Sequence, residues 1–448
     1  MSLQAGGVGR SVVSRGPITG DPLPGRLFPP LPGEVRWGLE RTRRILAATG
    51  EPLRTTPVLH VAGTNGKGTV ARVWAEILRA QGYRVGLYTS PELLSFRERF
   101  LVDGRPIPDE RLLTWADELR PVLLREGPTY FEAATTLAFL AFEREEVDVA
   151  VMEVGLGGRL DATNVVAPVV TAITSVSMDH EAMLGSSVVA IAREKAGIFK
   201  PGVSAFAASD DPAVIGALTR EAATLGVPLT RVLNPGGTYT VDGLRVTLMT
   251  RRWGELDLES PLVGRHQLQN VALAVRSMQV LPPRVAVTAG AVVRGVAAAR
   301  VPGRFQVERA KERSWVLDVA HNPGAAAALA ATLTSVELPG PRVAVVGMAL
   351  EKDHAAFLST LHPVLDQLVL TVPPSMLADR RWRPEALLEG FPGARIETDF
   401  ESALTLGREL VGQGGTVVVT GSSAIVGDTL RHLERIPLEA LPVSGDFG

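Results

Sequence analysis

The run Gly63-Thr64-Asn65-Gly66-Lys67-Gly68-Thr69 decides the fold, because it joins an apolar strand to a helix. The strand is Val58–Ala62, and apolar residues recur at helical spacing from the end of the run as far as Gly82. Glycines in such a turn let backbone N–H groups point at a phosphate, while the helix N-terminus adds its dipole and Lys67 its charge. A plain Gly/Asn turn is the alternative. The lysine favours a nucleotide phosphate site, in which Thr69 can reach Mg²⁺.

Strand and helix patterns alternate outward from this loop. Before residue 300 we expect strands at 58–62, 84–89, 148–154 and 169–175, helices at 36–48, 70–81, 112–124, 131–145, 187–196 and 266–278, and a β-rich section at 203–262. After it we expect strands at 315–319, 342–346, 367–372 and 416–420, and helices at 325–333, 354–365, 385–388 and 401–411. Such alternation predicts α/β domains with parallel sheets covered by helices.

The predicted organisation has three parts. Residues 36–300 form an N-terminal domain with a P-loop-type parallel sheet, and residues 301–448 form a smaller, Rossmann-like α/β domain. Residues 1–35 are expected to be a mobile arm, because the first 33 residues contain seven Gly and six Pro.

The composition excludes several classes of function. Lys and Arg number 46 against 48 Asp and Glu, so no basic field suggests nucleic acid or an anionic membrane as a partner. The absence of cysteine excludes disulfides, thiolate metal sites and cysteine nucleophiles, and it fits a reducing cytoplasm. We find no apolar run long enough to span a bilayer. We expect a cytoplasmic monomer.

Three further residues are candidates for chemistry. Glu153 ends the apolar strand Val149–Glu153, and a buried strand delivers its last residue to the mouth of the sheet, where Mg²⁺ could bind. An acid at a strand end is often structural, but the glycines of 155–158 favour close backbone approach there. His180 follows another strand and reads either as a structural donor or as a ligand. From its position in the helical pattern alone, Lys195 is predicted to be a solvated charge at a helix end.

Taken in order, the motifs closely resemble the folylpolyglutamate synthase/dihydrofolate synthase family of the Mur ligase superfamily. The resemblance runs from about residue 36 to the end of the chain. The segments that carry it are 60–69, 89–93, 96–99, 153–164, 179–180, 194–200, 266–270, 302–305, 318–323 and 352–353. One departure is Glu92, which stands where the family often has histidine.

The resemblance implies a role for each matching residue. It places ATP phosphates on Gly63, Thr64, Asn65, Gly66, Lys67, Gly68 and Thr69. It places two Mg²⁺ ions on Thr69, Ser90, Glu153 and His180, with Lys195 carbamylated. It assigns adenine to Asn270, and phosphates and ribose to Arg304 and Asp318, with His321 nearby. It places Thr129 and Phe131 in a segment that contacts the pterin, and Phe96 and Arg97 in the loop on the folate side.

The implied reaction is an ATP-dependent addition of L-glutamate to a folate, and the sequence leaves open whether dihydropteroate is an acceptor as well. A carboxylate is a poor acyl donor, so ATP first converts it to an acyl phosphate, which the amine of glutamate attacks with release of phosphate. Lys67, Lys195 and His180 would serve the phosphate transfer, and His321 is the candidate acceptor of the amine proton. Because both halves supply residues, we expect closure about a linker at 299–304.

Two other functions remain open at this point. A cell-wall ligase acting on a UDP-linked muramyl substrate belongs to the same superfamily, although the 96–99 and 155–164 segments favour folate. A P-loop phosphotransferase or nucleotide-gated binding module would need neither the second α/β domain nor Lys195. Only a ligase would release ADP in a glutamate-dependent way.

Overall fold

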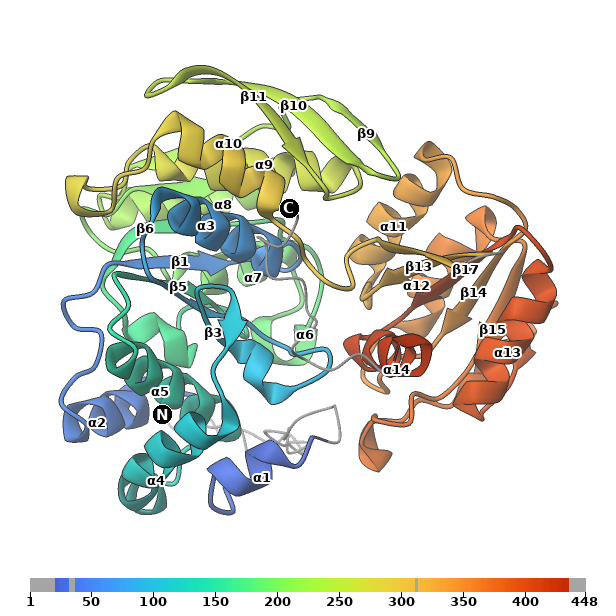
Figure 1. The fold of residues 1–448 in the computed structure, drawn as a ribbon, viewed down its shortest axis with the longest axis horizontal. Helices are drawn as coiled ribbons and strands as arrows, with labels where there is room; N and C mark the ends of the chain where they lie inside the picture. The colour runs from blue at the N-terminus through green and yellow to red at the C-terminus, as the bar shows by residue number, and fades with distance from the viewer. Residues whose placement is uncertain (1–20, 32–36, 311–312, 435–448) are drawn as a thin grey trace, which may run out of the picture.

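An eight-stranded sheet forms the centre of the larger domain (Figure 1), in the computed structural model of residues 21–31, 37–310 and 313–434. The strand order is β4-β3-β2-β5-β1-β6-β7-β8. The strands are β1 Val58–Ala62, β2 Val85–Tyr88, β3 Phe100–Val102, β4 Arg105–Pro106, β5 Val149–Glu153, β6 Pro168–Ile173, β7 Ala205–Ala207 and β8 Leu229–Arg231. From β2 to β8 every pairing is parallel, and β3 and β4 add an antiparallel edge. The loop after the central strand β1 therefore opens at the middle of the carboxyl edge, where ligands bind in such sheets.

Helices cover both faces of this sheet. The helices are α1 Leu23–Leu27, α2 Glu40–Ala48, α3 Lys67–Gln81, α4 Asp109–Glu126, α5 Tyr130–Arg144, α6 Glu181–Leu184, α7 Val188–Ala196, α8 Pro212–Thr224, α9 Arg265–Met278 and α10 Ala289–Ala298. Short 3₁₀ turns lie at η1 Phe96–Arg99, η2 Ala162–Val165 and η3 Pro283–Val285. A three-stranded antiparallel sheet, β9 Thr238–Thr240, β10 Gly243–Thr250 and β11 Gly254–Ser260, lies over α9 and α10 (Figure 1).

The smaller domain is built on a six-stranded sheet in the order β12-β13-β17-β14-β15-β16. Its strands are β12 Gln306–Ala310, β13 Arg313–Asp318, β14 Arg342–Val346, β15 Gln367–Leu370, β16 Arg395–Ile396 and β17 Thr416–Thr420. Its helices are α11 Pro323–Ser335, α12 His354–Leu361, α13 Phe400–Val411 and α14 Ser423–Glu434, with 3₁₀ turns η4 His362–Val364, η5 Ala378–Arg380 and η6 Pro384–Gly390. Only β12 runs antiparallel, so the sheet is mixed.

The predicted α/β class is confirmed, and three local expectations differ from the structure. The section at 203–262 holds α8 as well as strands, and the helix expected at 385–388 is the 3₁₀ turn η6. The helix expected from residue 36 begins at Glu40, and residue 36 itself lies outside the described residues. No helix in the described part of the chain is long and apolar enough to cross a membrane.

The expectation of a mobile arm is wrong for residues 21–31. There α1 buries Leu23 and Leu27, and Phe28 follows them into the same core as α4 and α5. These three apolar side chains outweigh the Gly/Pro-rich composition of the run, because each finds a place in an existing core. Residues 1–20 lie outside the described residues.

The loop between β2 and β3, residues 89–99, connects the two domains. Its Leu93 and Leu94 pack in the core of the smaller domain, in the cluster that contains Trp315. Gly427 of α14 permits this contact, because a Cβ there would lie 2.2 Å from the carbonyl oxygen of Leu93. Arg431 of α14 donates a hydrogen bond to the carbonyl oxygen of Leu94 at 2.7 Å. The 89–99 loop therefore belongs to the packing of both domains.

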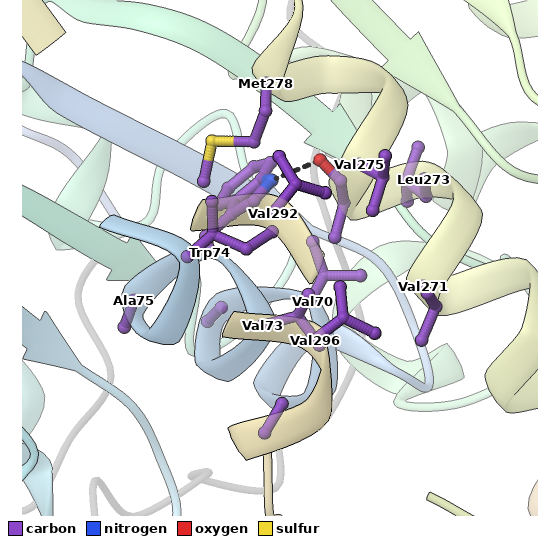
Figure 2. Close-up of a cluster of buried hydrophobic side chains, with 14 of the residues drawn as sticks. Val70, Val73, Trp74, Ala75, Val271, Leu273, Val275, Met278, Val292 and Val296 are labelled. Carbon is purple, nitrogen blue, oxygen red and sulfur yellow. Dashed lines mark hydrogen bonds between the residues drawn. The ribbon is translucent and has the colours of Figure 1, made fainter. Parts of the chain in front are cut away.

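Helix α3, which carries the end of the phosphate loop, is held by α9 and α10. Figure 2 shows side chains of the three helices meeting around Trp74. The indole of Trp74 donates to the Ser277 hydroxyl at 2.9 Å and to the Ala274 carbonyl at 3.1 Å, so even its polar atom is paired in this core. Gly295 of α10 lets that helix touch α3, because a Cβ there would lie 2.4 Å from the Cα of Ile77.

We therefore expect opposite effects from two glycine substitutions in α10. Gly295→Ala should lower the free energy of unfolding by about 1–3 kcal/mol, because the added methyl meets α3 backbone. Gly290→Ala is the matched control, since its methyl would meet only the Arg294 guanidinium at 3.2 Å. Helix propensity predicts a gain of up to about 1 kcal/mol for that control. Denaturant unfolding measures both, and equal effects at the two positions would contradict the packing described.

Candidate active site

The glycine-rich run is a tight loop between β1 and α3. Gly63 and Gly66 have φ of 151° and 93°, and a Cβ on them would lie 1.7 Å from Thr174 Oγ1 and 2.6 Å from Asn270 Oδ1. Neither position tolerates a side chain. Lys67 Nζ turns back over the loop and donates to the carbonyl oxygens of Gly63 at 3.1 Å and Thr64 at 3.0 Å. The loop thus has the form of a phosphate cradle with a lysine across its mouth.

Thr69 and Glu153 fit a divalent cation beside this loop. Thr69 Oγ1 is buried without a hydrogen-bond partner, and Glu153 is a buried carboxylate whose Oε2 accepts the Ser90 backbone N–H at 3.2 Å. Burial raises the pKa of Glu153, and the charge of Lys67 opposes that rise. Within the described ranges no three His, Asp or Glu side chains are grouped to hold a metal. Mg²⁺ fits such a site, since it takes one or two protein carboxylates and completes its shell with phosphate and water.

Lys195 reaches the same loop from α7. Its side chain is buried, and Nζ donates to the carbonyl oxygen of Gly63 at 2.8 Å. Burial, together with the positive charge of Lys67, lowers the pKa of Lys195 to about 7. The backbone around Lys195 is fixed by Gly158, where a Cβ would lie 2.8 Å from the Lys195 carbonyl oxygen. The lysine that spacing alone marked as solvated is therefore an internal group at the phosphate loop.

A polar cluster around Asp179 joins this edge to the smaller domain. Asp179 accepts Lys352 Nζ at 2.7 Å and Asn322 Nδ2 at 3.0 Å, and Asn322 also donates to Asn65 Oδ1 at 3.1 Å. Although burial opposes it, the imidazole of His321 and the charge of Lys352 hold the pKa of Asp179 well below its usual range. The residues that bridge the domains therefore contact the phosphate loop directly.

Both candidate histidines lie at this cluster. His180 Nε2 is 3.8 Å from Asp179 Oδ1, and burial together with the charge of Lys352 lowers the pKa of His180 to about 3. His321 Nδ1 lies 2.9 Å from the carbonyl oxygen of Val319. Because a carbonyl only accepts, Nδ1 carries the hydrogen, and Nε2 is the basic nitrogen of the neutral ring. That nitrogen lies 3.6 Å from Asp179 Oδ2 and can donate to it only once it has taken up a proton, so Asp179 favours the protonated ring and the protonated ring favours ionised Asp179.

Of the predicted nucleotide residues, Asn270 lies against the loop, and Arg304 is close enough for its charge to act on Lys67. Asn270 is buried, contacts Gly66 as described, and donates to Gln267 Oε1 at 2.9 Å. Asp318 is buried and accepts the backbone N–H groups of Phe305 and Ala320, each at 2.8 Å. Burial raises the pKa of Asp318, and the charge of Arg304 opposes that rise.

The four predicted substrate residues are placed differently from one another. Phe131 packs against Gly155, two residues after Glu153, where an added Cβ would lie 2.4 Å from its ring. Thr129 caps α5 by accepting the Glu132 backbone N–H at 3.2 Å. Phe96 is fully buried in an aromatic core, and Arg97 pairs with Asp109 at 3.0 Å. Their placement gives no support to substrate contacts by Phe96 or Arg97.

Sequence reasoning gave no role to Asp179, Asn322 or Lys352. All three lie in motifs that carried the resemblance, and that position was the available signal. Their contacts with one another cross the domain interface and cannot be inferred from spacing along the chain.

Comparisons with known proteins give consistent findings. The family model described as the Mur ligase middle domain matches residues 61–278, and the one described as the Mur ligase, glutamate ligase domain matches residues 303–423. The folylpolyglutamate synthase of Lacticaseibacillus casei is 34% identical over 85% of this chain and 91% of its own length. The dihydrofolate synthase/folylpolyglutamate synthase of Escherichia coli is 36% identical over 73% of this chain and 76% of its own length.

One relative is much longer than this chain. A probable bifunctional folylpolyglutamate synthase/dihydropteroate synthase of Haloferax volcanii is 35% identical over 88% of this chain, which spans 48% of that protein's length. Among solved structures, a Mycobacterium tuberculosis folylpolyglutamate synthase complexed with ADP and AMPPCP has a TM-score of 0.82 and 32% identity, covering 90% of this chain and 96% of that one. An E. coli protein in complex with DHPP and ADP has a TM-score of 0.79 and 32% identity, and the match covers 90% of this chain and 94% of that one.

The burial of Lys195 predicts a pH-dependent effect of its removal. Its pKa is about 7 in the folded chain against 10.5 for an ordinary lysine, so the unfolded chain binds more protons between these values and wild-type stability rises with pH there. Below pH 7 the cost of burying the ammonium is fully present. Lys195→Met should therefore be more stable than wild type at pH 6, by a few kcal/mol at about 1.4 kcal/mol per pKa unit.

The measurement is urea unfolding of both proteins from pH 6 to pH 10. The advantage of the methionine variant should shrink steadily above pH 7. A variant that is less stable than wild type at pH 6, or a difference that does not change with pH, would contradict the assignment of a costly buried charge.

Proposed function

Because the chain belongs to the folylpolyglutamate synthase family of the Mur ligase superfamily, it is an ATP-dependent ligase that adds glutamate to a folate, and we propose that the reaction runs through an acyl phosphate held between its two domains. The observation that carries this proposal is the meeting of Lys67, Lys195 and Glu153 at the Gly63–Thr69 loop, beside the domain-bridging Asp179 cluster. Phosphoryl transfer needs positive charge and a positioned acceptor, and this edge supplies both.

The first step is transfer of the γ-phosphoryl group of ATP to the folyl carboxylate. The backbone of the Gly63–Thr69 loop and Lys67 bind the phosphates, while Asn270, Arg304 and Asp318 hold the rest of the nucleotide. We assign two Mg²⁺ ions to Thr69, Ser90, Glu153, His180 and Lys195. When bound, the ions neutralise the charge that develops on the phosphoryl group. Of these ligands, Thr69 and Glu153 have the support of an unpartnered hydroxyl and a buried carboxylate.

Lys195 is proposed to act as a carbamate. The ammonium group first releases a proton to solvent, and the neutral amine then adds to CO₂ and releases a second proton to solvent, so that the side chain changes from positive to negative beside the metal site. A pKa near 7 makes the neutral amine available at physiological pH. The carbamate would also relieve the repulsion between Lys195 and Lys67, which share the Gly63 carbonyl.

The second step is attack by the glutamate amine on the acyl carbon, with departure of phosphate. The amine must lose a proton, and His321 Nε2 is the basic nitrogen at this interface. Phosphate departs with the electron pair of the broken acyl–oxygen bond, and the amide forms. We place the hinge for closure at 299–304, with the Asp179–Lys352 ion pair and the Asn65–Asn322 bonds as contacts between the closing faces.

The acceptor is proposed to include both tetrahydrofolate, with its polyglutamates, and dihydropteroate. The E. coli relative carries both activities in its name, and Phe131 against Gly155 offers an aromatic wall for a pterin ring. The net charge of −2 supports small anionic substrates met by placed residues over nucleic acid. We propose a cytoplasmic monomer.

The decisive experiment offers dihydropteroate and tetrahydrofolate separately with ATP, Mg²⁺ and L-glutamate, and measures amide product and ADP. Glutamate-dependent ADP release with either acceptor is the expected result. ADP release without glutamate would indicate a phosphotransferase or a nucleotide-gated module instead. A UDP-linked muramyl substrate tested in parallel should give no product, and turnover of it alone would overturn the folate assignment.

Replacing Lys195 separates its chemistry from its charge. Lys195→Ala should abolish ligation while the fold is kept, and Lys195→Arg should fail to restore activity, because a guanidinium cannot form the carbamate. Loss of at least about 10²-fold in kcat is expected for both, as for removal of other groups that stabilise a transition state. Folate-dependent ADP release within a few fold of wild type by either variant would remove the carbamate from the mechanism. Circular dichroism controls for folding.

A further inference from the structure

We propose that Asp21 and Phe28, in the 21–31 segment, are positioning residues that hold the two walls flanking Glu153. The segment lies outside both matched domain models. The structure connects it to the site by two separate lines of contact. The kinetic consequences rest on the proposed function, whereas the connection itself does not.

The first line runs from Asp21 along the 89–99 loop. Asp21 Oδ2 accepts the Ser95 hydroxyl at 2.9 Å and the Phe96 backbone N–H at 2.8 Å, and Asp21 Oδ1 accepts the Leu23 N–H at 2.8 Å. The carboxylate therefore caps η1 and fixes the start of α1 at once. The other end of the same loop is Ser90, whose N–H donates to Glu153.

The interior of the 89–99 loop is stiff enough to transmit that anchoring. The Glu98 carboxylate accepts the backbone N–H groups of Leu93, Leu94 and Ser95 at 2.9, 2.7 and 2.8 Å. Arg99 forms a buried ion pair with Glu92, and its guanidinium lies 5.3 Å from the centre of the Phe96 ring. Because these bonds tie residues 92–99 together, we expect the loop to move as a unit, so that a shift at Ser95 reaches Ser90.

The second line runs from Phe28 through α5. The Phe28 ring meets Phe96 and Tyr130 edge-on, with centroids 6.0 Å and 5.7 Å apart. Tyr130 opens α5, and the next residue is Phe131, whose ring fills the space in front of Gly155. Gly155 lies two residues beyond Glu153. The 21–31 segment thus supports the loop before the carboxylate and the aromatic wall after it.

Asp21 is the sharper residue to test, because it bonds to the loop without filling the core. Asp21→Ala removes the acceptor of the Ser95 and Phe96 donors. Asp21→Asn keeps one carbonyl oxygen that can accept them and loses the bond to Leu23. Asp211→Ala is the matched control, since Asp211 caps α8 in the same domain by accepting the Ala213 N–H at 2.8 Å.

The first measurement is amide hydrogen exchange of the three variants and wild type, without substrates. Asp21→Ala should speed exchange of the Phe96 amide, and also of the Ser90 amide, each by about tenfold, as expected for loss of a capping bond. Asp21→Asn should fall between it and wild type, and Asp211→Ala should change neither amide. Faster exchange at Phe96 with Ser90 unchanged would overturn the proposal, since Asp21 would then cap η1 and nothing more.

The second measurement is steady-state kinetics with the folate acceptor found for wild type. Asp21→Ala should raise KM for the acceptor and lower kcat, each by about fivefold, and leave KM for ATP within about twofold, because Asp21 does not touch the phosphate loop. Equal losses in Asp211→Ala would show a general effect of destabilisation and overturn the proposal. If wild type shows no glutamate-dependent ADP release, the proposed function fails, while the Ser90 exchange result still decides the role of Asp21.

Discussion

Two lysine ammonium groups converge on one carbonyl oxygen, that of Gly63, and the rest of the structure depends on keeping them there. Lys67 Nζ lies 3.1 Å and Lys195 Nζ 2.8 Å from that oxygen, and the Lys195 side chain is buried while that of Lys67 is partly buried. Like charges in such a place repel, so the arrangement requires negative charge beside it. Glu153 supplies part of this negative charge, and under the proposed function the ATP phosphates and the Lys195 carbamate would supply the remainder. The fold must therefore hold β1, β5 and α7 in fixed positions relative to one another, because β1 leads into the loop, β5 ends in Glu153 and α7 carries Lys195.

The parts of the fold that were predictable from sequence are those set by local patterns. β1 and β17 occupy the expected residues, because central parallel strands are apolar on both faces and stand out in any context. The antiparallel edge strand β12 and the 3₁₀ turn η6 were not predicted, since their conformation depends on which neighbours they pair with or pack against. Composition also misled at 21–31, where three apolar residues decide the outcome.

The site divides in the same way. The Gly63–Thr69 loop can be recognised from the sequence alone, because local backbone geometry requires its glycines. Glu153 was reachable from the rule that ligands gather at strand ends. Lys195 needed the resemblance, since only the packing of α7 against Gly158 turns a helix-end lysine into a buried one. Asp179 and Lys352 lie 173 residues apart, and their ion pair exists only once the two domains meet.

Part of the hydrophobic core of the smaller domain comes from the larger one, because Leu93 and Leu94 of the 89–99 loop pack in it. The smaller domain therefore cannot be replaced by that of a related protein through a single junction at the linker. A chimera joined at residue 300 would need the donor's loop as well, or an apolar cavity would open beneath α14. A larger side chain on either surface would need a compensating change on the other, and Gly427 is the position with the least room, because a Cβ there would lie 2.2 Å from the Leu93 carbonyl oxygen.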